Sequence, residues 1–117
     1  MDKEERIRLI KKLEKELNYR RFVHTMGVAC TASALAMRYG EDMERAELAG
    51  LLHDCAKCLP LARMQELCRH SFLPVRAPER EDPALLHAKA GAALAELEYG
   101  VSDREILEAI AWHTTGR

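Results

Sequence analysis

Apolar residues recur at the spacing of a helix along nearly the whole chain, and this period limits the fold more than any other feature. In the first segment Ile7, Ile10, Leu13 and Leu17 fall on one stripe of a helix over residues 2–17. The same reasoning predicts helices over residues 19–39, 42–56, 83–99 and 102–112, and a shorter helix that follows a break at residues 59–61 and ends near residue 70. No stretch shows the convincing alternation of apolar and polar residues that a half-buried strand requires. The sequence therefore predicts an all-α fold.

Glycine, proline and capping residues mark the expected ends of these helices. Gly40 and Gly100 each follow the last residue of a helical pattern, where a left-handed residue can end the helix. Asp82 precedes a proline and is expected to cap the helix that begins there. Residues 102–105 read as a capping box at the start of the last helix. The segment 71–82, which holds two prolines and several charges, is expected to be a loop.

The bulk composition is that of one ordinary globular domain over residues 1–117. The chain is 48% hydrophobic and 32% charged, and its formal net charge of -1 gives no basic field for nucleic acid. No apolar run approaches the roughly 18–20 residues that a membrane span needs. The charged, amphipathic N-terminus has no signal-peptide core. We therefore expect a cytoplasmic protein without a nucleic-acid or membrane partner, and leave open whether it forms a homodimer.

Four histidines occupy positions where a core-facing leucine would be expected, each on a different predicted helix. They are His24, His53, His87 and His113, and each has a glycine or alanine one turn away. A single inward histidine is usually a hydrogen-bonded core residue, but four rings need more buried partners than this sequence offers. A metal ion would satisfy one nitrogen of each ring. His70 has mostly polar helical neighbours and is expected at the surface without a role.

Asp54 adds an oxygen ligand beside His53, about 100° around the predicted helix. Its two oxygens could bridge two cations, and histidines with a bridging aspartate suit iron, manganese or zinc better than calcium. Two metals about 3.5–4 Å apart can activate water and hold a phosphoryl group. Lys57, four residues after His53 and three after Asp54, shares their face. It is either a cation for substrate phosphates or a solvated lysine at a helix end.

The four cysteines are expected to be free thiols in a reducing compartment. Cys55 and Cys58 form a CxxC motif, but no second pair follows at similar spacing, as a structural zinc site would need. No predicted strand precedes the motif, so a thioredoxin-like context is missing as well. We predict that neither cysteine binds metal.

Three longer strings carry a resemblance to a known family. RRFVHTMGV over residues 20–28, LHDCAK over residues 52–57 and AIAWHTTGR over residues 109–117 occur in this order. Together they resemble the YqeK group of HD-type phosphohydrolases, which are bacterial symmetrical diadenosine tetraphosphate hydrolases. The resemblance runs from about residue 19 to the end of the chain, and it implies that residues 1–117 form the N-terminal and central part of an HD-domain helical bundle.

The resemblance implies hydrolysis of diadenosine tetraphosphate and related dinucleoside polyphosphates to two nucleoside diphosphates by a metal-activated hydroxide. It implies two divalent or mixed-valence metal ions, iron in the first place, with manganese, cobalt, zinc or magnesium as alternatives. One ion would be held by His24, His53 and Asp54, and the other by His87 and His113, with Asp54 bridging. Asp54 and Lys57 would be catalytic. The residues that would bind substrate phosphates are Lys57, Thr114, Thr115 and Arg117.

Two alternatives stay open. The chain could be another HD nucleotide phosphohydrolase or phosphodiesterase, or a truncated module that binds metal or nucleotide without turnover. Family members continue past HTTGR into further helices, one of which carries another aspartate ligand. We therefore expect those C-terminal helices to be absent here, and residues 1–117 alone to bind metal weakly, turn over slowly and self-associate.

Overall fold

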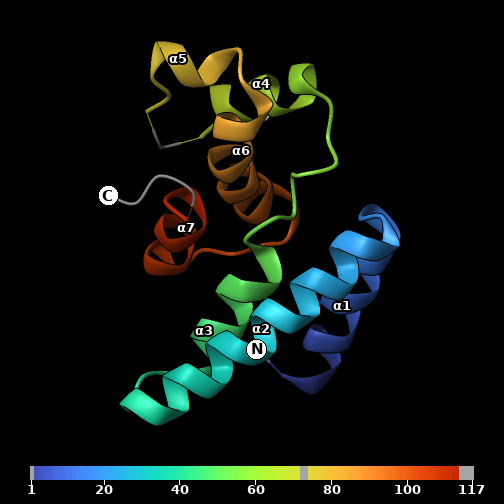
Figure 1. The fold of residues 1–117 in the computed structure, drawn as a ribbon, viewed down its shortest axis with the longest axis vertical. Coiled ribbons are helices and arrows are strands. Elements are labelled where there is room, and N and C mark those ends of the chain that lie inside the picture. The colour runs from blue at the N-terminus through green and yellow to red at the C-terminus, as the bar shows by residue number, and fades with distance from the viewer. Residues whose placement is uncertain (1, 72–73, 114–117) are drawn as a thin grey trace.

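The computed structural model describes residues 2–71 and 74–113, and within these ranges it is all-α, as predicted. The helices are α1 (Lys3–Glu16), α2 (Tyr19–Tyr39), α3 (Met43–Leu52), α4 (Leu61–Arg69), α5 (Ala77–Arg80), α6 (Pro83–Glu98) and α7 (Arg104–Ala111). Figure 1 shows two groups of helices: α1, α2 and α3 lie at one end of the molecule, and α4 to α7 lie at the other. The non-helical segment after α3 connects the groups. None of the described helices is long and apolar enough to cross a membrane.

Short polar side chains begin most of these helices. The side chain before each of α1, α2, α3, α6 and α7 accepts a backbone N–H of the first turn; these residues are Asp2, Asn18, Asp42, Asp82 and Asp103. Such caps satisfy amides that have no partner within the helix. The predicted capping box at residues 102–105 is wrong in its first residue. Asp103 is the cap, because its Oδ1 accepts the amides of Glu105 and Ile106.

Two other boundaries differ from the sequence prediction. The third helix ends at Leu52, four residues before the predicted end, and tight turns follow in which Cys55 N–H donates to Leu52 O and Lys57 N–H donates to Asp54 O. The expected loop over residues 71–82 contains the short helix α5. The ends of α2 agree with the prediction, and Gly40 follows it with φ 74°, a left-handed conformation that favours glycine.

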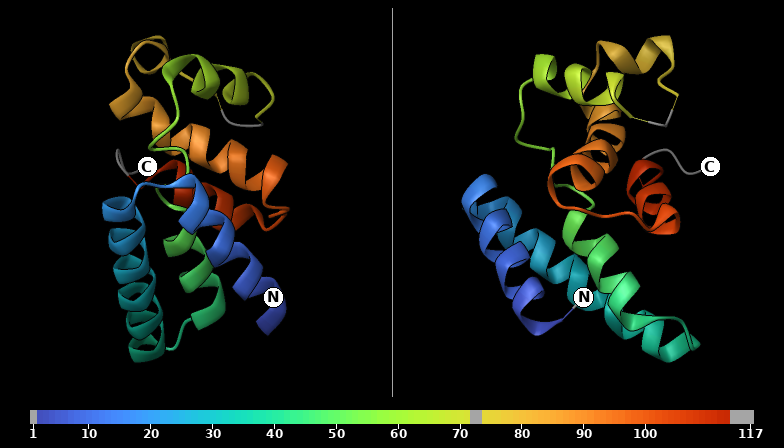
Figure 2. Two further views of the ribbon diagram at one scale, coloured as in Figure 1. Left: turned by 90° about the vertical axis from the view of Figure 1, so that its right-hand side faces the viewer. Right: turned by 180° about the vertical axis from the view of Figure 1, so that it is seen from behind.

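The core lies around α6, which contacts α4, α5 and α7 (Figure 2). Every residue of α6 from 86 to 95 is buried, and most of them are alanine or glycine. Small side chains allow neighbouring helices to approach this one from several sides. The large buried side chains around it include Leu51, Met64, Leu107 and Ile110.

A close approach also joins α2 to α3, the pair with the most extensive contact. A methyl group placed on Gly50 of α3 would lie 2.8 Å from the Cα of Ala29 on α2, so only glycine fits without a shift of backbone. The face of α2 that packs inward holds Thr25, Ala29 and Ala36. The expectation that His24 lies on the inward face is therefore wrong. Its helical neighbours Gly27, Thr31 and Leu35 are exposed.

Candidate metal centre

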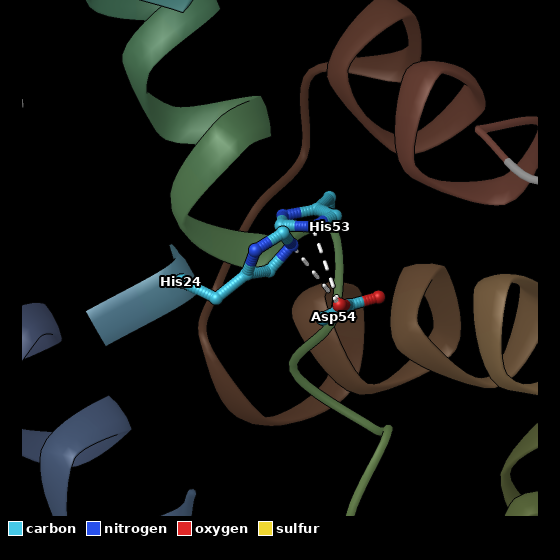
Figure 3. Close-up of side chains that lie close together, drawn as sticks. All are labelled: His24, His53 and Asp54. Atoms are coloured by element: carbon cyan, nitrogen blue, oxygen red, sulfur yellow. Dashed lines mark ion pairs between the residues drawn. The ribbon is translucent and has the colours of Figure 1, made fainter. Parts of the chain in front are cut away.

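The structure brings the five predicted ligand residues together where the two groups of helices meet. His24 comes from α2, His53 ends α3, Asp54 follows it, His87 comes from α6, and His113 follows α7. Asp54 lies at the centre of the cluster, and Figure 3 shows His24 and His53 beside it. Residues that are far apart in the sequence thus contribute to one site, although their role as ligands stays a prediction.

Each carboxylate oxygen of Asp54 faces two histidines. Oδ2 lies 3.3 Å from His53 Nε2 and 3.9 Å from His24 Nε2. Oδ1 lies 3.2 Å from His87 Nε2 and 3.3 Å from His113 Nε2. The cluster therefore divides into a first triad of His24, His53 and Asp54, and a second triad of Asp54, His87 and His113. Within each triad the potential ligand atoms lie within 4.8 Å of one another. This division has the composition that the family resemblance implied.

Backbone carbonyls orient three of the imidazoles. In each case the ring Nδ1 lies at hydrogen-bond distance from the carbonyl oxygen three residues earlier: 2.7 Å for His53, 2.9 Å for His87 and 2.6 Å for His113. A carbonyl only accepts, so Nδ1 must donate, and the neutral ring then presents the Nε2 lone pair. Histidine ligands of metal ions are typically fixed in this way. All three Nε2 atoms point to Asp54.

The electrostatics of the cluster favour a cation. His87 Nε2 and His113 Nε2 lie 3.3 Å apart, and two lone pairs at this distance repel each other unless a proton or a metal ion lies between them. Burial alone would raise the pKa of the Asp54 carboxyl, but the imidazoles of His113, His53 and His87, which donate to it through Nε2 when they are protonated, outweigh burial and hold that pKa far below its ordinary value. Asp54 therefore stays ionised in a site of imidazole nitrogens. This donor set fits two divalent first-row metal ions.

Access to the centre differs between its ligands. The side chains of Asp54 and His87 are 7% and 5% exposed, whereas that of His24 is 52% exposed. Burial would lower the pKa of His53, but its contacts with Asp54 and Gly50 outweigh burial and raise it. The bridging carboxylate is thus enclosed, while the His24 side of the first triad opens to solvent. A soluble substrate could reach the centre from that side.

The predicted substrate-binding residues are less well supported. Because α3 ends at Leu52, Lys57 is not on a continuous helix with His53, and the argument from helical spacing fails for it. The lysine is half-buried, and the cation that pairs with Asp54 among the described residues is Arg21. Thr114, Thr115 and Arg117 lie outside the described residues. Their roles stay predictions.

Arg21 is the residue at the centre that the sequence reasoning missed. Its Nη1 lies 3.2 Å from Asp54 Oδ2, the oxygen that also faces His24 and His53. The sequence held a signal for this contact, because Arg21 precedes His24 by three residues and so shares its side of α2.

Neither cysteine of the CxxC motif belongs to either triad, although Cys55 directly follows Asp54. The Cys55 thiol is buried, donates to the carbonyl of Gly91 at 3.3 Å, and has its pKa raised by burial to about 12. Cys58 is exposed, and its sulfur accepts from the Asn18 side chain at 3.5 Å. His70, expected at the surface, is exposed at the end of α4.

Known proteins are similar in sequence to most or all of this chain. The model of the HD domain matches residues 21–117. The chain is 39% identical over 117 residues to "Bis(5'-nucleosyl)-tetraphosphatase, symmetrical" of Bacillus subtilis, covering 100% of this chain and 61% of that protein. It is 42% identical over 108 residues to the protein of the same name from Staphylococcus aureus, covering 92% of this chain and 55% of that one.

A solved structure is similar in fold as well as in sequence. It is described as a predicted HD superfamily hydrolase involved in NAD metabolism from Clostridium acetobutylicum, with a TM-score of 0.86 and 40% identity over 94% of this chain and 58% of that one. The chain thus spans little more than half the length of these relatives. On its sequence match, its all-α fold and its histidine–aspartate cluster, this chain belongs to the HD-domain family.

Proposed function

We propose that this chain binds two metal ions and forms the catalytic centre of a hydrolase that cleaves diadenosine tetraphosphate symmetrically to two ADP. The observation that carries the proposal is the sharing of Asp54, with one oxygen toward His24 and His53 and the other toward His87 and His113. Relatives at 39% and 42% identity are named symmetrical bis(5'-nucleosyl)-tetraphosphatases, which supports this substrate class.

The roles of the chain's own residues follow from their geometry. His24 and His53 would hold one ion, His87 and His113 the other, and Asp54 would bridge them. When bound, such a pair of ions activates water and offsets the charge that builds on phosphoryl oxygens. The carbonyls of residues 50, 84 and 110 would keep the three rings from turning. Asp54, ionised across the working pH range, would keep the ions together.

A second candidate rests on the Clostridium structure, whose description names NAD metabolism. A metal-dependent hydrolase of this kind could act on another nucleotide that carries a phosphoanhydride. The same centre would serve such a substrate, because the residues of the two triads would contact metal ions and phosphate rather than the base. The choice between the two substrates is therefore a question for product analysis.

The test is turnover of a nucleotide panel by the metal-loaded chain, with iron, manganese, cobalt, zinc and magnesium supplied in turn. We expect ADP to be the sole product from diadenosine tetraphosphate, and Asp54→Asn to abolish its formation. His70→Ala, an exposed histidine outside the cluster, is the matched control and should act like the wild type. ATP and AMP as products, or faster cleavage of NAD, would refute the symmetrical reaction. Full metal content without turnover of any nucleotide would indicate a binding module.

A cytoplasmic location and a homodimer are also proposals for the protein, as is iron as its metal. Size-exclusion chromatography with light scattering would test the dimer. Metal analysis after expression without added metal would test iron.

A further inference from the structure

We propose that Arg21 and the open side of the first triad form a subsite for a phosphate group of the nucleotide substrate. The inference rests on the proposed function and adds to it a residue that contacts substrate. It begins from the ion pair between Arg21 and Asp54, which places a permanent cation at the edge of the metal centre.

The backbone holds Arg21 at a fixed place. It lies in the first turn of α2, and its amide donates to the side chain of the cap residue Asn18 at 2.9 Å. His24 follows one turn later on the same side of the helix. Both side chains reach the same oxygen, Asp54 Oδ2, at 3.2 Å from Arg21 Nη1 and 3.9 Å from His24 Nε2. The guanidinium is therefore next to the position where the first triad would hold its ion.

Most of the guanidinium's donors remain available. An arginine has five N–H donors in a planar fork, and the described residues give Arg21 one side-chain partner, through Nη1. The side chain is 36% exposed, whereas that of Asp54 is 7% exposed. The guanidinium thus has one nitrogen at the enclosed carboxylate, and the Arg21 side chain, like that of His24, is partly open to solvent.

Phosphate is the ligand that this arrangement suits. The planar guanidinium can donate two parallel hydrogen bonds to two oxygens of a phosphate group, and a metal ion beside it would bind a third oxygen of that group. The alternative ligand, a substrate carboxylate, is absent from the nucleotides of the proposed function. The chain's net charge of -1 offers no general attraction for a polyphosphate, so the attraction has to come from cations at the centre, and Arg21 would add to that of the metal ions.

A structural role for Arg21 is the competing explanation. In that case the arginine would serve only to place Asp54 for metal binding, and its loss would lower metal content. Asp54 already has four imidazoles around its two oxygens, three of them within 3.3 Å. The two explanations differ in what a substitution changes: phosphate affinity at constant metal content, or metal content itself.

The experiment measures ADP and inorganic phosphate binding to the metal-loaded chain by calorimetry, with metal per chain determined on the same samples. Arg21→Gln removes the charge and the fork, and Arg21→Lys keeps the charge alone. Arg20→Gln is the matched control, because it removes the same charge from the neighbouring exposed position. We expect Arg21→Gln to weaken ADP binding about 10- to 100-fold, the effect of losing charge-assisted hydrogen bonds. Arg21→Lys should recover part of the loss, and Arg20→Gln should bind like the wild type.

The metal content of Arg21→Gln should equal that of the wild type, and under turnover its KM should rise more than its kcat falls. Unchanged ADP affinity in Arg21→Gln would overturn the proposal, as would a loss of metal that accounts for the whole effect. Failure of the loaded wild type to bind ADP or phosphate would overturn it too. If ADP binding depends on Arg21 but diadenosine tetraphosphate is not cleaved, the subsite stands and the proposed reaction falls.

Discussion

At the scale of single residues, Asp54 organises the centre. It is buried and follows directly after α3, so the turn at residues 53–55 determines where its oxygens point. Three imidazoles that donate to its carboxylate when they are protonated keep its pKa low, although burial opposes ionisation. The sequence singled out the five residues of this cluster because each stands out chemically in an apolar pattern, and their role as ligands stays a prediction. The signal for Arg21, its position three residues before His24, was weak, because an arginine in the first turn of a helix is more often solvated than paired with a buried carboxylate.

The cysteines give a prediction about reactivity. Cys55 is buried and its thiol has a pKa of about 12, so the reactive thiolate is scarce near neutral pH. We expect iodoacetamide at about pH 8.5, near the pKa of a free thiol, to alkylate exposed Cys30 and Cys58 in the folded protein and to leave Cys55 unmodified. Mass spectrometry of the peptides measures this, with the unfolded protein as control. Alkylation of Cys55 at the rate of Cys58 would contradict the burial of Cys55 in the folded protein.

At the scale of helices, local signals predicted the ends of α2 and the start of α6, where a glycine stops one helix and an aspartate before proline begins the other. Local signals failed for α3. Residues 53–56 have no glycine or proline to end the helix, and the chain leaves the helix there in tight turns that accompany packing between the two groups of helices. The exposure of the His24 face could not be predicted either. An apolar stripe does not reveal which of two faces another element covers.

The contact between α2 and α3 predicts an effect of one methyl group. Gly50→Ala would place Cβ 2.8 Å from Ala29 Cα and 3.1 Å from Ala29 N, both backbone atoms of α2. We expect the free energy of unfolding to fall by about 1–3 kcal/mol, because this is the usual cost of overpacking. We also expect metal binding to weaken, because Gly50 O orients His53. Urea denaturation and metal titration measure the two effects.

Gly27→Ala is the control within α2, because its added methyl group would meet nothing within 4 Å. Replacing glycine by alanine inside a helix should raise the free energy of unfolding by about 0.5–1 kcal/mol. Equal destabilisation by both substitutions would contradict the close approach at Gly50.

A buried ion pair holds the α5 region against α6. Lys89 Nζ lies 2.8 and 3.1 Å from the two carboxylate oxygens of Glu79, donates to Pro74 O at 2.6 Å, and lies 4.8 Å from the centroid of the Trp112 ring. Lys89→Met would leave the buried Glu79 unpaired, and we expect the free energy of unfolding to fall by about 3–5 kcal/mol. The double variant Glu79→Leu with Lys89→Met should recover most of that loss.

This ion pair also has a pH dependence. Burial would raise the pKa of Glu79, but Lys89 outweighs it and lowers that pKa. The stabilisation is therefore complete above the ordinary pKa of glutamate and is lost as the pH falls through the lowered value. The stability difference between wild type and Lys89→Met, from urea denaturation at several pH values, should shrink on acidification. A difference that stays constant or grows would contradict the assignment.

At the scale of the whole molecule, the candidate centre lies between two groups of helices that each contribute residues to it. His24 and His53 come from the group of α1 to α3, and His87 and His113 come from the group of α4 to α7. Metal binding would therefore join the two groups of helices. It should raise the free energy of unfolding, by more the more tightly the metal binds the folded chain than the unfolded one. The sequence predicted which residues converge, because four histidines in helical patterns needed a common partner. The sequence did not predict how the two groups of helices are placed relative to each other, because that placement depends on contacts between residues that are distant in the sequence.

The account's central claim is that one aspartate and four histidines hold two metal ions. The most direct test is metal per chain after reconstitution, measured by mass spectrometry for the wild type, Asp54→Asn, His87→Ala and the control His70→Ala. We predict two ions for the wild type and for His70→Ala, one for His87→Ala, and a loss of both for Asp54→Asn. Two ions retained in Asp54→Asn, or a loss in His70→Ala equal to that in His87→Ala, would contradict the account.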